Sequence, residues 1–443
     1  MEYVLTKNVQ EQAVEMIKHW VSYPSVLDET ATDTPFGAEI QRCLEAALSD
    51  CEKLGFRTYL DPEGYYGYAE IGEGTESLAI LCHLDVVPAG DVSEWTSDPF
   101  KAEVRDGKLY GRGTQDDKGP TVAALFAVKA LVEQGKTFNK RIRFIFGTDE
   151  ENLWRCLNRY VEKEEKATYG FAPDAEFPLT YAEKGLLQSW VKGPGSQDLV
   201  LNNNGAFNVV PDKAVYQGDK LDQVKETLAS LGYDLTEKDG GLVVLGKSVH
   251  SKDADQGINA VTRLAEALSS VYSHPMLDFL QTFKQDVFAK AIFGDVEDEA
   301  SGKLTVNIAK LIITPEESKI GVDFRIPVTA DKEALAASFA SKAEEFGLTY
   351  EEYDYLASLY VPLDSELVTT LLSVYRELTG DMTEPISSGG ATFARTMENC
   401  VAFGAITDDV EVTFHQVDEC MPLKNIYESM EIYAHAIEKL ACK

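Results

Sequence analysis

The chain has 443 residues, of which 44% are hydrophobic, and its formal net charge is −33. This length favours two or three domains, and the acidic charge argues against partners such as nucleic acid or an anionic membrane. No stretch approaches the roughly 20 apolar residues that span a bilayer, and the N-terminus lacks the layout of a secretory signal. The seven scattered cysteines form no CxxC pair, which favours free thiols over disulfides. We therefore expect a cytoplasmic protein.

The first part of the chain alternates between strand-like and helix-like patterns. Strand-like runs occur at 77–82 and 141–147, and a helical pattern between them covers 121–135. Gly135 is the expected end of this helix, because glycine commonly follows the last helical turn. Such alternation predicts an α/β layer with a mostly parallel, mixed sheet flanked by helices.

Residues 186–359 show a different pattern, in which strands and helices are mixed in the manner of an α+β domain. The expected strands lie at 241–249, 304–313 and 318–326, and the expected helices lie near 220–231, 256–272 and 331–346. Afterwards the α/β pattern returns, with a helix at 365–380, a strand at 400–406 and a helix at 424–441. We therefore predict one discontinuous α/β domain, made of 1–185 and 360–443, with an α+β domain at 186–359 inserted into it.

The strand-like run at 77–82 leads directly into His83, and Asp85 follows two residues later. In open α/β sheets the loops at the carboxyl ends of the strands form the ligand-binding crevice. A carboxylate at Asp85 can hydrogen-bond the imidazole nitrogen that a metal leaves unused. Considered alone, His83 is better explained as a histidine satisfied within a capped turn.

Three clusters of carboxylates lie at the ends of other predicted strands or in neighbouring loops. They are Asp116 with Asp117, Asp149 with Glu150 and Glu151, and Asp174 with Glu176. Their mutual repulsion favours a bound cation, and His415 follows the strand-like run at 411–414. Each cluster alone indicates little, because turns and helix caps are rich in aspartate. Together, carboxylates and imidazoles at one sheet edge predict a site for one or two divalent ions, which can activate water for hydrolysis.

The stretches HLDVVP, GRGTQDDKGP, GTDEE, APDAEFP and FHQVDE follow one another along the chain. In this order they resemble the aminoacylase–glutamate carboxypeptidase family of dinuclear metallopeptidases, most of all its bacterial dipeptidase V and carnosinase-like branch. The resemblance covers nearly the whole chain. It implies an enzyme that hydrolyses dipeptides with two divalent ions as cofactors. We expect zinc, with manganese or cobalt as alternatives.

The resemblance also implies roles for the motif residues. The implied ligands of one ion are His83, Asp116 and Asp174, and those of the other are Asp116, Glu151 and His415. Asp116 would bridge the ions, Asp85 would orient His83, and Glu150 would be the general base that takes a proton from a metal-bridged water. Family members often have a cis peptide after the bridging aspartate, so we predict one between Asp116 and Asp117.

In this family the inserted domain is a lid that closes over the active site. The resemblance assigns His250 to the oxyanion of the tetrahedral intermediate and Asn208, Arg325, Gly389 and Gly390 to substrate binding. Arg325 suits a peptide carboxylate because its guanidinium is a planar fork. Structural alternatives are a cap for His250, an acidic partner for Arg325 and turns for the others. For an insert of this size the resemblance implies a ferredoxin-like, two-lobed lid and a monomer.

Three functions agree with this pattern, and all of them involve a small peptide or a related substrate. The first is metal-dependent hydrolysis of dipeptides to free amino acids. The second is deacylation of N-acyl amino acids, which uses the same chemistry with a different pocket. The third is a non-catalytic, metal-dependent peptide-binding protein, which has no use for a base such as Glu150. The large insert favours the dipeptidase.

Overall fold

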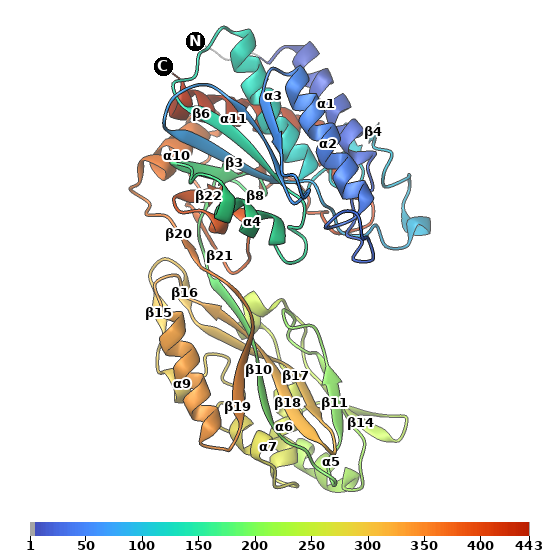
Figure 1. The fold of residues 1–443 in the computed structure, drawn as a ribbon. Coiled ribbons are helices and arrows are strands. Elements are labelled where there is room, and N and C mark those ends of the chain that lie inside the picture. The colour runs from blue at the N-terminus through green and yellow to red at the C-terminus, as the bar shows by residue number, and fades with distance from the viewer. Residues whose placement is uncertain (1–4, 443) are drawn as a thin grey trace. The chain divides into compact units, whose positions relative to one another are not determined.

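The computed structural model describes residues 5–442, which divide into two compact units (Figure 1). The first unit comprises the described residues up to Tyr181, then Leu359–Ile386 and the residues from Thr392 onward, and the second comprises Ala182–Ser358 and Ser387–Ala391. Most of the second unit is therefore one long insertion in the sequence of the first.

The first unit combines a large sheet with helices and short accessory strands. Its helices are α1 (Lys7–Val21), α2 (Ala38–Lys53), α3 (Lys118–Glu133), α4 (Arg155–Lys163), α10 (Glu366–Thr379) and α11 (Leu423–Ala441), with short 3-10 turns η1 (Val92–Glu94) and η3 (Phe393–Thr396). Its strands are β1 (Arg57–Leu60), β2 (Gly67–Ile71), β3 (Ser77–His83), β4 (Glu103–Arg105), β5 (Lys108–Tyr110), β6 (Arg141–Gly147), β7 (Tyr169–Ala172), β8 (Ala175–Glu176), β20 (Leu359–Tyr360), β22 (Cys400–Ala402), β23 (Ala405–Ile406) and β24 (Cys420–Pro422). Two further strands, β9 (Thr180–Glu183) and β21 (Ile386–Ser388), cross the sequence boundaries between the units.

The central sheet has the strand order β1-β2-β6-β3-β7-β22-β9-β20, and β21 pairs with β9. The middle strands β6, β3, β7 and β22 are parallel, whereas β1, β2 and β9 join antiparallel. The register places His83, the last residue of β3, opposite Gly147, the last residue of β6. The loops that follow these parallel strands therefore start at the same edge of the sheet. The predicted α/β fold with its mostly parallel mixed sheet is confirmed.

Helix α3 forms the buried centre of the helical layer. Val122, Leu125 and Val128 are each fully buried, because the helix contacts α1, α11 and the sheet strand β3 (Figure 1). The helix ends at Glu133, and Gly135 follows with a φ of 76°, a conformation that glycine adopts without a steric penalty. The expected end of this helix is confirmed, and α3 is therefore a rigid support for the loop that precedes it.

The second unit contains a five-stranded and a three-stranded antiparallel sheet, a separate two-stranded pair and five helices, counted over the described residues. Its strands are β10 (Gly185–Pro194), β11 (Leu201–Asn204), β12 (Lys213–Tyr216), β13 (Leu235–Lys238), β14 (Gly241–Leu245), β15 (Glu297–Asp298), β16 (Gly302–Lys303), β17 (Thr305–Ile313), β18 (Glu317–Ile326) and β19 (Thr349–Leu356). Its helices are α5 (Leu221–Ser230), α6 (Ala260–Ser269), α7 (Pro275–Leu280), α8 (Lys290–Phe293) and α9 (Lys332–Glu344), with the 3-10 turn η2 (Ser251–Gln256). The larger sheet has the order β11-β17-β18-β10-β19, the smaller one the order β12-β14-β13, and β15 pairs with β16.

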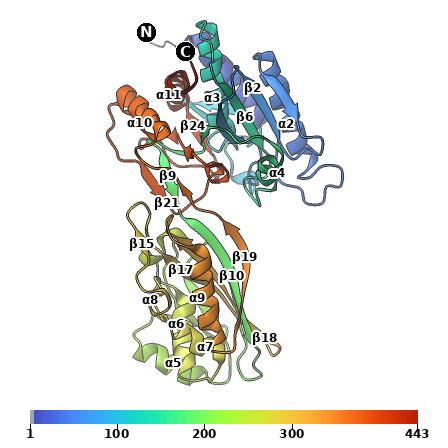
Figure 2. The ribbon, with the colours of Figure 1, turned by 60° about the vertical axis from the view of Figure 1, so that its left-hand side comes forward.

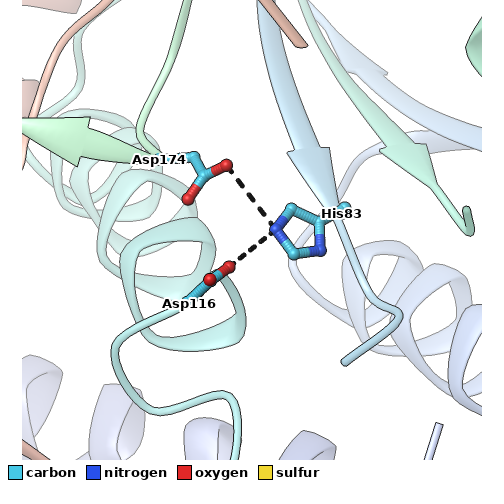
Figure 3. Close-up of side chains that lie close together, drawn as sticks. All are labelled: His83, Asp116 and Asp174. Carbon is cyan, nitrogen blue, oxygen red and sulfur yellow. Dashed lines mark ion pairs between the residues drawn. The ribbon is translucent and has the colours of Figure 1, made fainter. Parts of the chain in front are cut away.

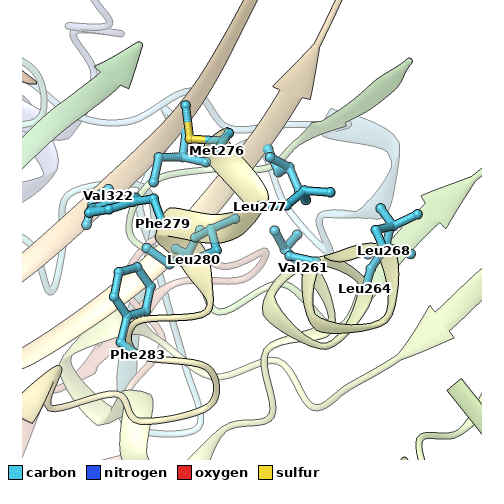
Figure 4. Close-up of a cluster of buried hydrophobic side chains, with 14 of the residues drawn as sticks. Val261, Leu264, Leu268, Met276, Leu277, Phe279, Leu280, Phe283 and Val322 are labelled. Atoms are coloured by element: carbon cyan, nitrogen blue, oxygen red, sulfur yellow. The ribbon is translucent and has the colours of Figure 1, made fainter. Parts of the chain in front are cut away.

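One hydrophobic cluster joins both sheets to the helices of the second unit. Figure 2 shows α6, α7 and α9 along the large sheet, and Figure 4 shows Leu264 and Leu268 of α6 near Leu277 and Leu280 of α7. Burial alternates along β10, so only one face of this strand takes part in the core. The two-lobed, ferredoxin-like form of this unit and its role as a lid stay predictions.

Phe339 of α9 provides a test of this core. Its ring is fully buried. The centre of this ring lies 5.0 Å from the ring centre of Phe324 and 5.5 Å from the ring centre of Phe279. We expect Phe339→Ala to destabilise the second unit by about 3–5 kcal/mol, because the cavity cannot close completely. Hydrogen exchange of peptides from β17 and β18 measures this loss. Tyr353→Ala is the control, because Tyr353 is 64% exposed, and a similar loss there would contradict the prediction.

Some predicted elements are shorter than expected, for local hydrogen-bonding reasons. The strand predicted at 241–249 ends at Leu245, because the N–H of Gly246 donates to the carbonyl of Asp212. The helix predicted at 256–272 covers Ala260–Ser269, since Asn259 caps it by accepting two backbone N–H groups. The strand predicted at 400–406 is interrupted, and its parts β22 and β23 join different sheets.

Two other predictions about local structure are wrong. The run at 411–414 is not a strand, because the N–H groups of Thr413 and Phe414 donate to the side chain of Gln115. Residues 387–391 were expected in the first domain and cluster with the second unit. Within that unit the N–H of Lys184, near the start of the insertion, donates to the carbonyl of Ser388, which connects this segment to the second unit.

The remaining expectations concern cysteines and membranes. All seven cysteines lie among the described residues, and each is a free thiol, as predicted. None of the helices formed by residues 5–442 is long and apolar enough to cross a lipid bilayer.

Candidate functional site

Five segments of the first unit bring their side chains together at the carboxyl ends of the parallel strands. His83 ends β3, Glu150 and Glu151 follow β6, and Asp174 follows β7. The other two segments are the loop before α3, which carries Asp116, and the turn between β23 and β24, which carries His415. This is the sheet edge at which the sequence predicted an ion site.

The first group of side chains surrounds the buried imidazole of His83 (Figure 3). Its Nε2 lies 2.9 Å from Oδ1 of Asp116 and 3.6 Å from Oδ2 of Asp174. The other ring nitrogen, Nδ1, lies 2.9 Å from the backbone carbonyl of Asp85 and 3.6 Å from its carboxylate. A neutral His83 that donates from Nδ1 to this carbonyl therefore presents an unprotonated Nε2 to the two aspartates.

The second group shares Asp116 with the first. Nε2 of His415 lies 3.0 Å from Oδ2 of Asp116 and 3.1 Å from Oε1 of Glu151. Each oxygen of Asp116 therefore faces a different histidine. His415 has a φ of 62°, a turn conformation that is uncommon for residues other than glycine. Asp116 lies close to both His83 and His415, as the sequence predicted.

The side chains of two further aspartates connect these segments by accepting hydrogen bonds from backbone N–H groups. Asp85 accepts a hydrogen bond of 3.0 Å from the N–H of Glu151. Asp117 accepts hydrogen bonds from the N–H of His83 and from the hydroxyl of Thr121, at 3.2 and 2.8 Å. The peptide bond between Asp116 and Asp117 is cis, as predicted. Asp85 thus positions both His83 and Glu151.

The three consecutive carboxylates after β6 have different surroundings. Asp149 pairs with the guanidinium of Arg155 at 2.7 Å and also accepts the N–H of Arg155, the first residue of α4. Glu151 faces His415, as described above. The carboxylate of Glu150 has no hydrogen-bond partner among residues 5–442, although its backbone carbonyl accepts from the indole of Trp154. Glu150 is therefore the carboxylate that remains free to exchange a proton.

The site places several buried carboxylates close to one another, and their burial and proximity shift their pKa values. Burial, followed by the neighbouring Asp116, raises the pKa of Asp174 and of Glu151, and burial raises the pKa of Glu150 well above its usual value. Burial opposes a charged His83, but the nearby carboxylates of Asp116, Asp174 and Asp85 raise its pKa well above the usual range. No lysine or arginine of the described residues forms an ion pair with these ligand carboxylates. The site therefore has an excess of negative charge that favours bound cations.

The residues present fit divalent ions. The candidate donor atoms of His83, Asp116 and Asp174 all lie within 4.8 Å of one another, and so do those of Asp116, Glu151 and His415. The buried Nε2 of His83 has no hydrogen-bond partner of good geometry among the described residues. A buried ring nitrogen left in this way is typical of a metal ligand. Imidazole nitrogen with carboxylate oxygen is a donor set that zinc takes in catalytic sites.

The residues predicted to bind substrate lie in the second unit. Arg325 is 3% exposed and donates from Nε and Nη2 to both oxygens of Asp323, which also lies on β18. The same guanidinium donates to the hydroxyl of Ser251 and to the carbonyl of Gly389, each at 2.7 Å. An acidic partner was the predicted alternative for Arg325, and here that partner is buried. Four of its five N–H groups are used, and one on Nη1 remains.

The other predicted residues of the second unit lie near η2. Nδ1 of His250 accepts the N–H of Lys252 at 3.1 Å, so this imidazole caps η2. Burial lowers the pKa of His250 to about 4, and the charges of Arg325 and Lys252 act in the same direction. The side chain of Asn208 is exposed, and its carbonyl accepts the N–H of Ser251. The N–H of Gly390 donates to the hydroxyl of Ser388.

The sequence analysis assigned no role to three residues that contact the predicted site residues or their neighbours in the chain. Asp323 is one, and the others are Gln115 and Glu419, which are nearly or fully buried beside Asp116 and His415. Gln115 and Glu419 stand inside the stretches GRGTQDDKGP and FHQVDE that carried the resemblance. The position of these two polar residues inside the motifs was the signal in the sequence that could have identified them.

The chain is similar to proteins of known family. The sequence pattern described as Peptidase family M20/M25/M40 matches residues 79–439. A relative from Bacillus subtilis (strain 168), named "Putative dipeptidase YtjP", is 36% identical over 458 residues, which cover 98% of each chain.

Two solved structures share the fold at low sequence identity. Human carnosine dipeptidase 1 has a TM-score of 0.60 at 17% identity and covers 96% of this chain and 95% of its own. The di-peptidase Dug1p from Saccharomyces cerevisiae has a TM-score of 0.61 at 15% identity and covers 97% of this chain and 96% of its own. The resemblance read from the motifs is confirmed. This chain belongs to the peptidase family M20/M25/M40.

Proposed function

We propose that this protein is a metal-dependent dipeptidase that hydrolyses dipeptides to free amino acids. The observation that carries the proposal is the position of Asp116, whose two oxygens face His83 and His415 at 2.9 and 3.0 Å. A carboxylate shared by two histidines from distant segments suits a pair of divalent ions. The names of the Bacillus subtilis relative and of the two solved structures support a dipeptide as the substrate.

Each ion has its own set of ligands in this proposal. The ligands are His83, Asp116 and Asp174 for the first ion, and Asp116, Glu151 and His415 for the second. Divalent ions bound there, with zinc as the expected metal and manganese or cobalt as alternatives, would supply Lewis acidity toward a water molecule and the scissile carbonyl. Asp85 fixes the orientation of His83 from behind, which keeps its Nε2 directed into the site.

Glu150 is the general base in this proposal. Of the three consecutive carboxylates, Asp149 pairs with Arg155 and Glu151 faces His415. The carboxylate of Glu150 contacts no hydrogen-bonding or charged partner within the described residues. Glu150 would take a proton from the attacking water and pass it to the nitrogen of the leaving amine. The contact from Trp154 to its carbonyl holds the backbone from which this side chain extends.

The second unit supplies the substrate-binding groups in this proposal. Because Nδ1 of His250 accepts a backbone N–H and its pKa is lowered, the imidazole is neutral above about pH 5 and carries its proton on Nε2. This N–H would donate to the oxyanion of the tetrahedral intermediate. Arg325 would offer its remaining Nη1 N–H to the peptide carboxylate, with Asn208, Gly389 and Gly390 as further contacts.

Ion binding should depend on pH. Hydrogen bonds that His415 donates to Asp116 and Glu151 raise its pKa to about 10 in the ion-free protein, so its imidazole is protonated at neutral pH. An ion must displace that proton, and the apparent affinity should therefore rise by up to about tenfold per pH unit between about pH 6 and 9. Calorimetric titration with Zn²⁺ in buffers of different ionisation enthalpy measures the protons released. An affinity that stays constant over this range would contradict the prediction.

The proposed function is tested with a panel of substrates and a metal count. The purified protein is assayed with Ala-Ala, Xaa-His dipeptides and N-acetyl amino acids, before and after removal of metal by a chelator. The proposal expects hydrolysis of dipeptides that the chelator abolishes and added metal restores, with two ions per chain. Preference for N-acetyl amino acids would instead establish a deacylase, and binding of dipeptides without hydrolysis would establish a peptide-binding protein.

A further inference from the structure

Glu419 is a buried carboxylate that binds the loop carrying Asp116. Its Oε1 accepts the backbone N–H groups of Gly113, Gln115 and Asp116 at 3.0, 2.9 and 3.3 Å. Its Oε2 accepts from the guanidinium of Arg112 at 2.6 Å. One carboxylate from the turn that carries His415 therefore holds the whole backbone that leads into Asp116.

Gln115 makes the complementary contacts in the opposite direction. Its Oε1 accepts the N–H groups of Thr413 and Phe414 at 2.7 and 2.8 Å. Its Nε2 donates to the carbonyls of Glu411 and Cys420 at 3.0 and 3.2 Å. The residue before Asp116 thus holds the backbone on both sides of His415.

Asp116 lies in an irregular loop two residues before α3, and His415 lies in a turn that is farther from any helix or strand. The residues between β5 and α3 and those from 411 to 419 are irregular, and His415 itself has a positive φ. His83 ends a strand, and Asp174 and Glu151 follow strands closely. The separation between Asp116 and His415 therefore depends on the contacts of Gln115 and Glu419.

We propose that Gln115 and Glu419 are positioning residues that form a reciprocal clasp between the Asp116 loop and the His415 turn, and that this clasp sets the affinity for the second ion. This inference rests on the proposed function, because it needs the two ion sites. Both clasped segments supply ligands to the second ion, namely Asp116 and His415. Only Asp116 among the ligands of the first ion lies on a clasped segment. A loosened clasp should therefore weaken the second ion more than the first.

Glu419→Gln is the first variant of the test. Its amide has the shape of the carboxylate but only one accepting oxygen, so an NH₂ group must face either Arg112 or the three backbone N–H groups. Gln115→Glu is the second variant, in which an oxygen replaces the NH₂ group and faces the carbonyls of Glu411 and Cys420. Asp418→Asn is the matched control, because its carboxylate is next to Glu419 but binds the N–H and hydroxyl of Thr96.

Stepwise titration of the metal-free proteins with Co²⁺, followed by absorption spectroscopy and calorimetry, gives the two affinities separately. We expect both variants to bind the first ion within about threefold of the unmodified chain and the second about 10- to 100-fold more weakly. The double variant should lose little more than the stronger single variant, because both side chains serve one clasp. Asp418→Asn should bind both ions as the unmodified chain does.

The outcomes separate this inference from the proposed function. Folded Glu419→Gln and Gln115→Glu proteins that bind the second ion normally would overturn the clasp, as would an equal weakening of both ions. If Glu419→Gln does not fold, Gln115→Glu decides alone. An unmodified chain that binds fewer than two ions would overturn the proposed dinuclear site itself, before any variant is considered.

Discussion

Replacing Asp116 by alanine is expected to remove both ions and at least about a thousandfold of kcat/KM. Among residues 5–442, Asp116 is the only side chain that faces both histidines, so its loss takes one ligand from each proposed set. Metal ions supply several kcal/mol of transition-state stabilisation, and each 1.4 kcal/mol corresponds to a factor of ten in rate. Plasma emission spectroscopy counts the ions, and dipeptide hydrolysis gives kcat/KM.

Asp364→Ala is a suitable control for this experiment. Asp364 is an exposed aspartate of the first unit, outside the five segments that form the site. It should leave the metal content and the rate unchanged. An Asp116→Ala protein that keeps two ions and hydrolyses dipeptides normally would eliminate the assigned centre.

Replacing Glu150 by glutamine is expected to lower kcat by about 10²–10⁴ while both ions stay bound, because a glutamine amide cannot accept the proton of the attacking water. The substitution keeps the shape of the side chain, and it breaks no ion pair between Glu150 and another residue of the described range 5–442. KM should change little, since the residue does not bind the substrate in the ground state. Single-turnover kinetics with metal analysis of the same sample measures both effects.

Glu176→Gln is the matched control for Glu150. Glu176 is exposed in β8, two residues after Asp174, so the same charge is removed from a neighbouring segment. It should retain full activity. Comparable losses in the two variants would indicate a general effect of charge, and a normal rate in Glu150→Gln would exclude this residue as the base.

The central layer and the grouping of side chains at the candidate ion site could be predicted because their signals are local. His83 follows an unbroken apolar run, and α3 is marked by its apolar period and by Gly135. The carboxylates of the site stand in short motifs at the ends of such elements. Their convergence could be anticipated because parallel strands end at one edge of a sheet.

The remaining features depend on contacts between distant positions, which no local pattern reveals. Residues 411–414 have the alternation of a strand, but Gln115, about 300 positions away, accepts the N–H groups of Thr413 and Phe414. Gly389 clusters with the second unit because Arg325 donates to its carbonyl. The pairing of Arg325 with Asp323 could have been suspected from their spacing, since alternate residues of a strand share one face.

The way in which the insertion begins and ends has a consequence for how such proteins diversify. Its first strand β10 and its last strand β19 are antiparallel neighbours, and Leu186 lies opposite Leu356. The ends of the insertion are thus adjacent, and the host chain has only a short gap to close. A segment of quite different length or architecture can be exchanged at this point while the hydrolytic machinery keeps its scaffold. Changes in the insertion can therefore alter substrate binding while the scaffold of the first unit stays the same.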